Sequence, residues 1–121
     1  TLFSIRELAD PGGLAAFKER SNELERRTAR ANGTRTLNLD PGLLSLSRVM
    51  LATTKASAHR VPLRDGLYGE ITLLYRHGSY RPLEWTYPDF QSAPFLEWLA
   101  GVRSGYHEQL RTLDPRRPWR L

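Results

Sequence analysis

Two hairpin turns in the middle of the chain constrain its fold more than any other feature. Asp65-Gly66 and His77-Gly78 are dipeptides typical of tight β-turns, and the residues between them alternate as those of a strand do. The sequence therefore predicts a three-stranded antiparallel meander, with strands over residues 59–63, 67–75 and 79–85. Pro82 places the third strand at an edge of the sheet, because proline cannot donate to a ladder.

Two other segments have the apolar spacing of amphipathic helices. The first runs from about residue 10 to the Asn32-Gly33 turn, and Leu14, Phe17 and Leu24 form its narrow apolar stripe. The second begins near Ser92, and its apolar residues recur every three or four positions: Phe95, Leu99, Val102, Tyr106, Leu110 and Leu113. We expect an α+β fold, in which both helices pack on one face of an antiparallel sheet of three to four strands.

Residues 34–53 are less regular. Residues 34–39 alternate well enough to predict a short strand, and Asp40-Pro41-Gly42 predicts a sharp turn after it. Ser45 could cap a short helix that continues to residue 53. A strand over residues 49–53 is the alternative, because the stretch is too short for its period to decide.

Length and composition fit one domain over residues 1–113, followed by a short basic tail over residues 114–121. The chain has 121 residues, of which 40% are hydrophobic, so it can bury a core. It has no cysteine, which excludes disulfides and thiolate metal sites and makes a reducing, cytoplasmic compartment the simplest expectation. No apolar run approaches the roughly 20 residues that a membrane-spanning helix needs.

The charge of the chain allows anionic partners without requiring them. The formal net charge is +5, and all but two of the 18 basic residues are arginine. These arginines are scattered along the sequence rather than set to read base edges. Any binding to nucleic acid should therefore be weak and independent of sequence.

Polar and aromatic residues at turns and strand ends form the candidate ligand-binding site: Asp40, Lys55, His59, Arg60, Glu70, Trp85, Tyr87 and Asp89. Lys55, His59 and Arg60 could meet an anion, and the carboxylates could accept hydrogen bonds from hydroxyl groups. Trp85 or Tyr87 could stack on a flat part of a ligand. Alternatively, these rings plug the end of the sheet with their polar tips hydrogen-bonded.

The register of the first hairpin decides the role of Arg60. A three-residue loop with its glycine in the left-handed region places Arg60 opposite Glu70 as a cross-strand ion pair. A two-residue loop shifts the pairing by one residue and leaves Arg60 for a ligand. The site hypothesis also requires Asp40 and Asp89 to converge on His59 or Arg60 in one cleft.

No catalytic signature accompanies these residues. The chain has no glycine-rich phosphate loop with its lysine, no nucleophile elbow for a serine triad and no metal-ligand spacing such as His-x-x-x-His. We expect no metal, no cofactor is indicated, and whether the chain is an enzyme stays open. Two functions remain. One is binding of a small anionic, phosphate-bearing ligand in a polar cleft, and the other is a nucleic-acid- or protein-binding module that uses a basic sheet face.

The order of the motifs resembles a bacterial and archaeal family, domain of unknown function 4416. The resemblance covers roughly residues 1–110 and rests on Asn38-Leu39-Asp40-Pro41-Gly42, Leu51-Ala52-Thr53-Thr54-Lys55, His59-Arg60, Asp65-Gly66-Leu67-Tyr68-Gly69-Glu70 and Trp85-Thr86-Tyr87-Pro88-Asp89. The family has no established activity, so the resemblance implies no reaction. Its members tend to have an aromatic residue where this chain has Leu43.

The resemblance also carries an expectation about what precedes the chain. Members of the family usually begin with a further strand and helix, so this chain would be their C-terminal portion. A missing partner strand should leave a sheet edge or an apolar patch exposed. A homodimer formed through that surface is then expected.

Overall fold

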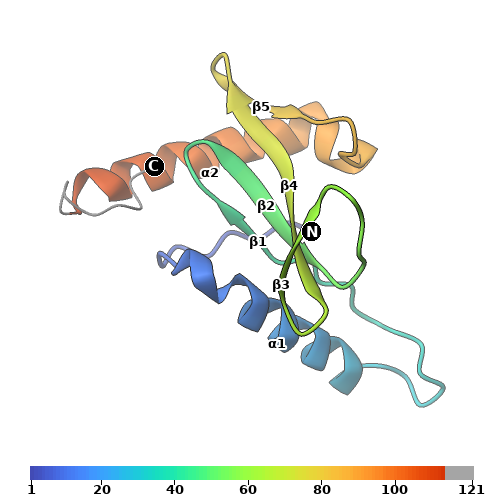
Figure 1. The fold of residues 1–121 in the computed structure, drawn as a ribbon. Coiled ribbons are helices and arrows are strands. Elements are labelled where there is room, and N and C mark those ends of the chain that lie inside the picture. The colour runs from blue at the N-terminus through green and yellow to red at the C-terminus, as the bar shows by residue number, and fades with distance from the viewer. Residues whose placement is uncertain (114–121) are drawn as a thin grey trace. The chain divides into compact units, whose positions relative to one another are not determined.

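The computed structural model describes residues 1–113, which form an α+β fold with two main helices and an open antiparallel sheet of five strands (Figure 1). The elements are η1 (Pro11–Gly13), α1 (Leu14–Arg27), β1 (Gly42–Leu44), β2 (Arg48–Thr53), β3 (Arg60–Arg64), β4 (Leu67–Arg76), β5 (Ser79–Pro82), η2 (Pro88–Gln91) and α2 (Ala93–Arg111). The strand order is β1-β2-β4-β3, and β5 also pairs with β4. The predicted fold class is confirmed, and the sheet has one strand more than the three to four expected.

The chain divides into two compact units. Among the described residues, unit 1 comprises Thr1–Ile5, Leu44–Val49 and residues 71–113, and unit 2 comprises Arg6–Leu43 and Met50–Glu70. The boundary falls within β1, β2 and β4, so all three strands contribute residues to both units. No helix in residues 1–113 is both long enough and apolar enough to cross a membrane.

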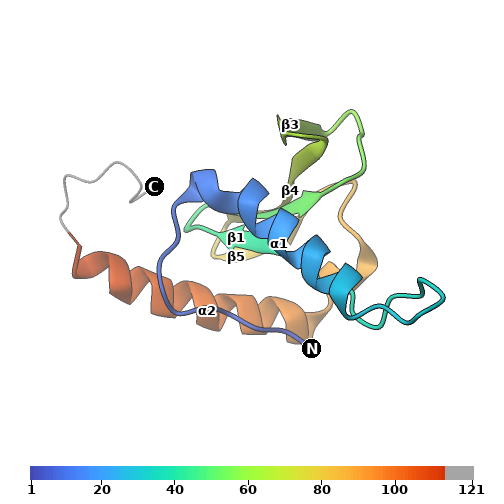
Figure 2. The same ribbon diagram turned by 90° about the horizontal axis from the view of Figure 1, so that it is seen from below.

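Unit 1 contains a continuous apolar core. Val49, Leu73, Tyr80 and Leu99 are buried together, and five partly buried side chains pack against them: Leu44, Tyr75, Phe95, Leu96 and Trp98. The second predicted helix is confirmed as α2, a long helix that Figure 2 shows uninterrupted. Its Leu99 and Leu110 are buried, as the apolar spacing predicts.

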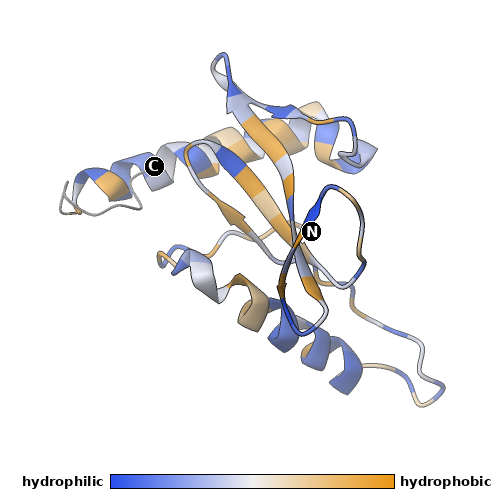
Figure 3. Cartoon of the chain, viewed as in Figure 1, coloured by the Kyte–Doolittle hydropathy of each residue, from blue (hydrophilic) through white to orange (hydrophobic). Residues whose placement is uncertain are grey.

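In unit 2, the apolar stripe predicted for α1 is wrong. Phe17 and Leu24 are 43% and 47% exposed, and Figure 3 shows α1 as a largely hydrophilic helix. The buried face of α1 consists of Leu14, Ala15, Lys18, Ser21 and Glu25. Two of these side chains bind the backbone of Leu39: Lys18 Nζ donates to its carbonyl oxygen at 3.2 Å, and Glu25 Oε1 accepts from its N–H at 2.7 Å. These hydrogen bonds allow the charged side chains of Lys18 and Glu25 to be buried, because a buried charged group needs a partner.

The same contacts explain why residues 34–39 do not form the predicted strand. Their polar groups bind α1 and the turn after it instead of a neighbouring strand. Besides the two bonds to Leu39, Thr36 Oγ1 donates to the carbonyl of Thr28 at 2.7 Å. Helix α1 ends at Arg27, several residues before the predicted Asn32-Gly33 turn, and the Thr28 hydroxyl binds the carbonyl of Leu24 at 2.8 Å.

The segment after Ser45 is a strand rather than a short helix. Ser45 does use its side chain as a cap, but for the turn between β1 and β2: its Oγ accepts from the N–H groups of Ser47 and Arg48 at 3.3 and 3.2 Å. Gly42 lets the two strands approach closely, since a Cβ there would lie 2.6 Å from the carbonyl oxygen of Met50. The alternative strand prediction is the correct one.

The hairpin between β3 and β4 has a two-residue loop, but Arg60 pairs in the register that a three-residue loop would give. Asp65 and Gly66 both have positive φ, 49° and 73°, and Arg64 pairs with Leu67, so the loop has two residues. The register then shifts between Pro62 and Arg64. This bulge restores the pairing of Arg60 with Glu70. Of the two alternatives that the sequence left open, the loop has the length of the second, whereas Arg60 and Glu70 pair as in the first.

Candidate functional site

The 54–59 loop, which joins β2 to β3 in unit 2, is held in place by Arg60. The Nε of Arg60 donates to Glu70 Oε2 at 2.6 Å, and its Nη1 donates to the carbonyl of Lys55 at 2.9 Å. The Arg60 and Glu70 side chains are only 10% and 5% exposed. A buried ion pair on the β3–β4 hairpin therefore fixes the backbone of the loop.

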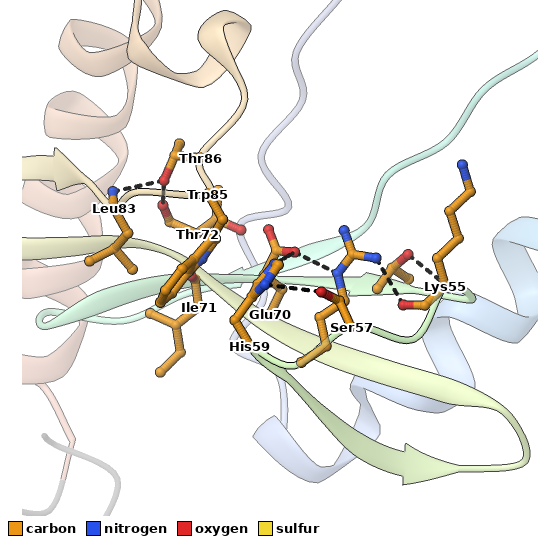
Figure 4. Close-up of polar contacts among 11 residues, drawn as sticks. Lys55, Ser57, His59, Glu70, Ile71, Thr72, Leu83, Trp85 and Thr86 are labelled. Carbon is orange, nitrogen blue, oxygen red and sulfur yellow. Dashed lines mark hydrogen bonds and ion pairs between the residues drawn. The ribbon is translucent and has the colours of Figure 1, made fainter.

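His59 continues this network toward the surface. Its Nε2 lies 2.9 Å from Glu70 Oε2, and its Nδ1 lies 3.2 Å from Ser57 Oγ, as Figure 4 shows. An ionised Glu70 can only accept hydrogen bonds, so His59 donates from Nε2. In the neutral imidazole, Nδ1 is then the acceptor for the Ser57 hydroxyl. The three side chains thus form a hydrogen-bonded chain from the buried carboxylate of Glu70 through His59 to the exposed hydroxyl of Ser57.

The exposed surface of the 54–59 loop carries one cation, Lys55, and hydroxyl groups that can donate hydrogen bonds. Lys55 is exposed, and Figure 4 shows its side chain extending away from the other side chains drawn. The sequence from Thr53 to Arg64 contains no acidic residue. The carboxylate beneath the loop, Glu70, already faces Arg60. The local charge of this surface is therefore positive.

The structure places the other candidate residues as follows. Asp40 is exposed in unit 2, where Asn38 Nδ2 donates to it at 3.3 Å. Tyr87 and Asp89 are exposed in unit 1, at the beginning of η2. The convergence of Asp40 and Asp89 on His59 or Arg60 stays a prediction.

Trp85, in unit 1, binds the backbone of the sheet. Its Nε1 donates to the carbonyl of Ile71 at 2.8 Å, and the neighbouring Thr86 hydroxyl donates to the carbonyl of Thr72 at 2.6 Å (Figure 4). The Thr86 hydroxyl in turn accepts from the N–H of Leu83 at 2.8 Å. These contacts favour the sheet-capping alternative for Trp85, because the polar tip of its ring is already used.

Sequence reasoning missed Ser57. A lone serine in a loop has no signature of its own, and its relevance appears only when His59 is seen to bind Glu70 through one nitrogen and Ser57 through the other. The one available signal was the spacing, because a hydroxyl two residues before a histidine can reach the near nitrogen of its ring. Within residues 1–113, no group of three or more His, Asp or Glu side chains could hold a metal ion.

Comparison with known proteins gives a family and nothing more. No curated protein and no solved structure matches the chain. The family described as domain of unknown function (DUF4416) matches residues 1–106, which include every candidate residue from Asp40 to Asp89. This match spans most of the 121 residues. The chain therefore belongs to the family described as domain of unknown function (DUF4416).

Proposed function

We propose that unit 2 binds a small anionic ligand, one that bears a phosphate group, at the 54–59 loop. The observation that carries this proposal is the pairing of Arg60 with Glu70 beneath the loop. The pair neutralises the buried carboxylate and fixes the loop, so the polar side chains that remain exposed on it are the cation Lys55 and the hydroxyl groups of Thr54 and Ser57. A phosphate offers several acceptor oxygens and negative charge to such a surface.

Each side chain has a distinct role in this proposal. Lys55 acts as a compact positive charge, the usual way in which lysine meets phosphate. Ser57 donates a hydrogen bond from its hydroxyl, and His59 adds a second positive charge when it is protonated. Arg60 positions the loop and does not itself meet the anion, because its Nε and Nη1 bind Glu70 and the loop backbone.

A thermal-shift screen of inorganic phosphate, pyrophosphate, nucleotides and phosphorylated metabolites tests the proposal on this chain. A ligand at 100 times its Kd should raise the free energy of unfolding by about 2.7 kcal/mol. The Lys55→Ala variant should weaken binding by about tenfold, which corresponds to about 1.4 kcal/mol. Arg26→Ala is the matched control, since Arg26 is an exposed cation on α1.

The outcome is decided by comparing the two variants. Saturable stabilisation that Lys55→Ala weakens and Arg26→Ala leaves intact supports the site. If Lys55→Ala and Arg26→Ala weaken the ligand-induced stabilisation equally, only the overall positive charge of the chain contributes to binding. Unchanged titrations in Lys55→Ala and His59→Ala would reject the assigned residues.

The alternative, a nucleic-acid-binding module, has one observation in its favour. Arg20, Arg26 and Arg30 are exposed on α1 and just after it, and they form no ion pair among the described residues. A helix with unpaired arginines can contact a phosphate backbone without reading base edges. This surface uses α1 rather than the sheet face that the sequence suggested.

A further inference from the structure

The hydrogen-bond chain Ser57–His59–Glu70 has the arrangement of a serine nucleophile with its general base. Ser57 Oγ lies 3.2 Å from His59 Nδ1, and His59 Nε2 lies 2.9 Å from Glu70 Oε2. These distances are within the reach expected for a nucleophile, a base and a third group that orients the base. Ser57 is exposed, whereas the side chain of Glu70 is 5% exposed. Any reaction of Ser57 would therefore occur at the protein surface, whereas the carboxylate that orients His59 is buried.

The orientation of His59 is what makes a base available. Glu70 accepts the Nε2 proton, so the lone pair of neutral His59 lies on Nδ1, the nitrogen that faces Ser57. Arg60 donates to the same carboxylate oxygen at 2.6 Å and holds the Glu70 side chain in place. When His59 takes a proton, the resulting imidazolium faces a carboxylate at hydrogen-bond distance. This is the stabilisation that a general base needs.

We propose that Ser57 is a nucleophile that cleaves carboxylic esters, with His59 as its general base and Glu70 as a positioning residue. In the first step, Ser57 Oγ bonds to the carbonyl carbon and its proton moves to His59 Nδ1. The carbon–oxygen bond of the ester then breaks, and the departing alcohol takes the proton from His59. Water attacks the acyl-serine in the same way, so the acid is released and Ser57 is restored.

The substrate class follows from the surroundings of the loop. Lys55 lies two residues before Ser57, and the residues on either side of Ser57, Ala56 and Ala58, have small side chains. The preferred ester therefore bears an anionic group that Lys55 can meet. This preference rests on the proposed function, whereas the reactivity of Ser57 toward an uncharged reagent does not.

An uncharged fluorophosphonate tests the nucleophile directly. Ser57 Oγ should bond to phosphorus as the phosphorus–fluorine bond breaks and fluoride leaves, with the serine proton passing through His59 to water. Peptide mass spectrometry should locate the adduct on Ser57 and not on Ser104, an exposed serine of α2 that serves as the internal control. The labelling rate should be lower in acid than at neutral pH, because only an unprotonated general base can accept the serine proton.

Variants separate a catalytic role from a structural one. His59→Gln should lower the labelling rate of Ser57 by about 100-fold or more, the usual contribution of a general base. Circular dichroism establishes that this variant is folded, and Glu70→Gln should flatten the dependence of the rate on pH. Comparable labelling of Ser57 and Ser104, or an unchanged rate in folded His59→Gln, would overturn the inference. Phosphate binding without labelling rejects the nucleophile alone, and labelling without phosphate binding rejects the proposed function alone.

Discussion

At the scale of single residues, Glu70 is the centre of the site. Its carboxylate is buried and faces Arg60 at 2.6 Å and His59 at 2.9 Å through the same oxygen. A buried charge is tolerated only when it is paired, so each partner of Glu70 has a structural effect as well as any functional one. Variants of these residues need a stability measurement beside every binding measurement.

Arg60→Ala should lower the free energy of unfolding by about 3 kcal/mol or more, because it leaves Glu70 buried without its main cation. The double variant Arg60→Met with Glu70→Leu should regain most of that loss, since it removes both buried charges. Urea unfolding of the single and double variants measures both effects. A loss below about 1 kcal/mol for Arg60→Ala would show that the pair is effectively solvated.

Arg64 on the same strand provides the matched control. It binds Glu19 through two nitrogens, at 2.6 and 3.0 Å, but both side chains are more than two-fifths exposed. Arg64→Ala should therefore lower the free energy of unfolding much less than Arg60→Ala does, because solvent screens an exposed ion pair. Arg64 also faces Asp65 at 2.9 Å, so the contrast between Arg60 and Arg64 compares a buried ion pair with exposed ones.

Because of Tyr80, the free energy of unfolding of unit 1 should decrease at alkaline pH. Burial raises the pKa of Tyr80 above its ordinary value of about 10, and its hydroxyl donates to the carbonyl of Ser45 at 2.6 Å. The unfolded chain ionises near the ordinary pKa while the folded chain stays neutral. Stability is therefore complete below about pH 10 and falls as the pH rises toward the folded-state pKa.

Tyr80→Phe should reduce this alkaline loss. At neutral pH the variant should be less stable by about 1–3 kcal/mol, because the Ser45 carbonyl loses its donor. Between about pH 9 and pH 11, its free energy of unfolding should fall less steeply than that of the wild type. Tyr87→Phe, at a ring that is 57% exposed, is the control. Equal alkaline slopes for Tyr80→Phe and the wild type would refute this assignment.

At the scale of secondary-structure elements, β3 is an edge strand that is closed to further pairing. Pro62 has no N–H, so its pair with Tyr68 cannot be a hydrogen-bonded pair, and its carbonyl faces away from β4. Arg60 shares this orientation, and its N–H binds the carbonyl of Ser57 at 3.1 Å. The outer edge of β3 therefore offers carbonyls without matching donors, which disfavours a homodimer formed by strand pairing at this edge.

Pro62→Thr should open that edge. The substitution restores an N–H that faces outward on an exposed, apolar strand whose Val61 is 62% exposed. Sedimentation velocity over a range of concentrations should show more association for Pro62→Thr than for the wild type. Pro82→Thr at the end of β5 is the control. If the wild type already associates strongly and Pro62→Thr does not change this, the contact between copies lies outside the edge of β3.

The elements also show which parts of the structure the sequence can predict. The meander and α2 were predictable because their turns and apolar spacing agree with their burial. The face of α1 and the path of residues 34–39 were not, since Lys18 and Glu25 are buried to bind the backbone of Leu39. The Arg60–Glu70 register was one of the two registers that the sequence allowed. The bulge that produces it was not predictable, because the sequence leaves the loop length open and the bulge compensates for that length.

At the scale of the whole molecule, the two units have different character. Unit 1 holds the apolar core between α2 and its strands, and unit 2 holds the 54–59 loop with its buried ion pair. Both the candidate nucleophile Ser57 and the cation Lys55 belong to unit 2. The net charge of +5 acts on any anionic partner in addition to these local contacts.

Binding to nucleic acid should be weak and sensitive to salt. If two arginines of α1 contact phosphates, affinity should fall about tenfold between 50 and 200 mM salt. Fluorescence anisotropy with two unrelated oligonucleotides measures the slope and the sequence preference together. Tight binding that survives high salt, or a strong preference for one sequence, would favour the module over the ligand site.

The 54–59 loop is the proposed ligand-binding site of this chain. A titration of the ¹⁵N-labelled chain with pyrophosphate, followed by amide chemical shifts, tests it most directly. We expect saturable shifts concentrated at residues 54–59, which Lys55→Ala weakens and Arg26→Ala preserves. Shifts that centre on α1, or that Lys55→Ala leaves unchanged, would contradict it.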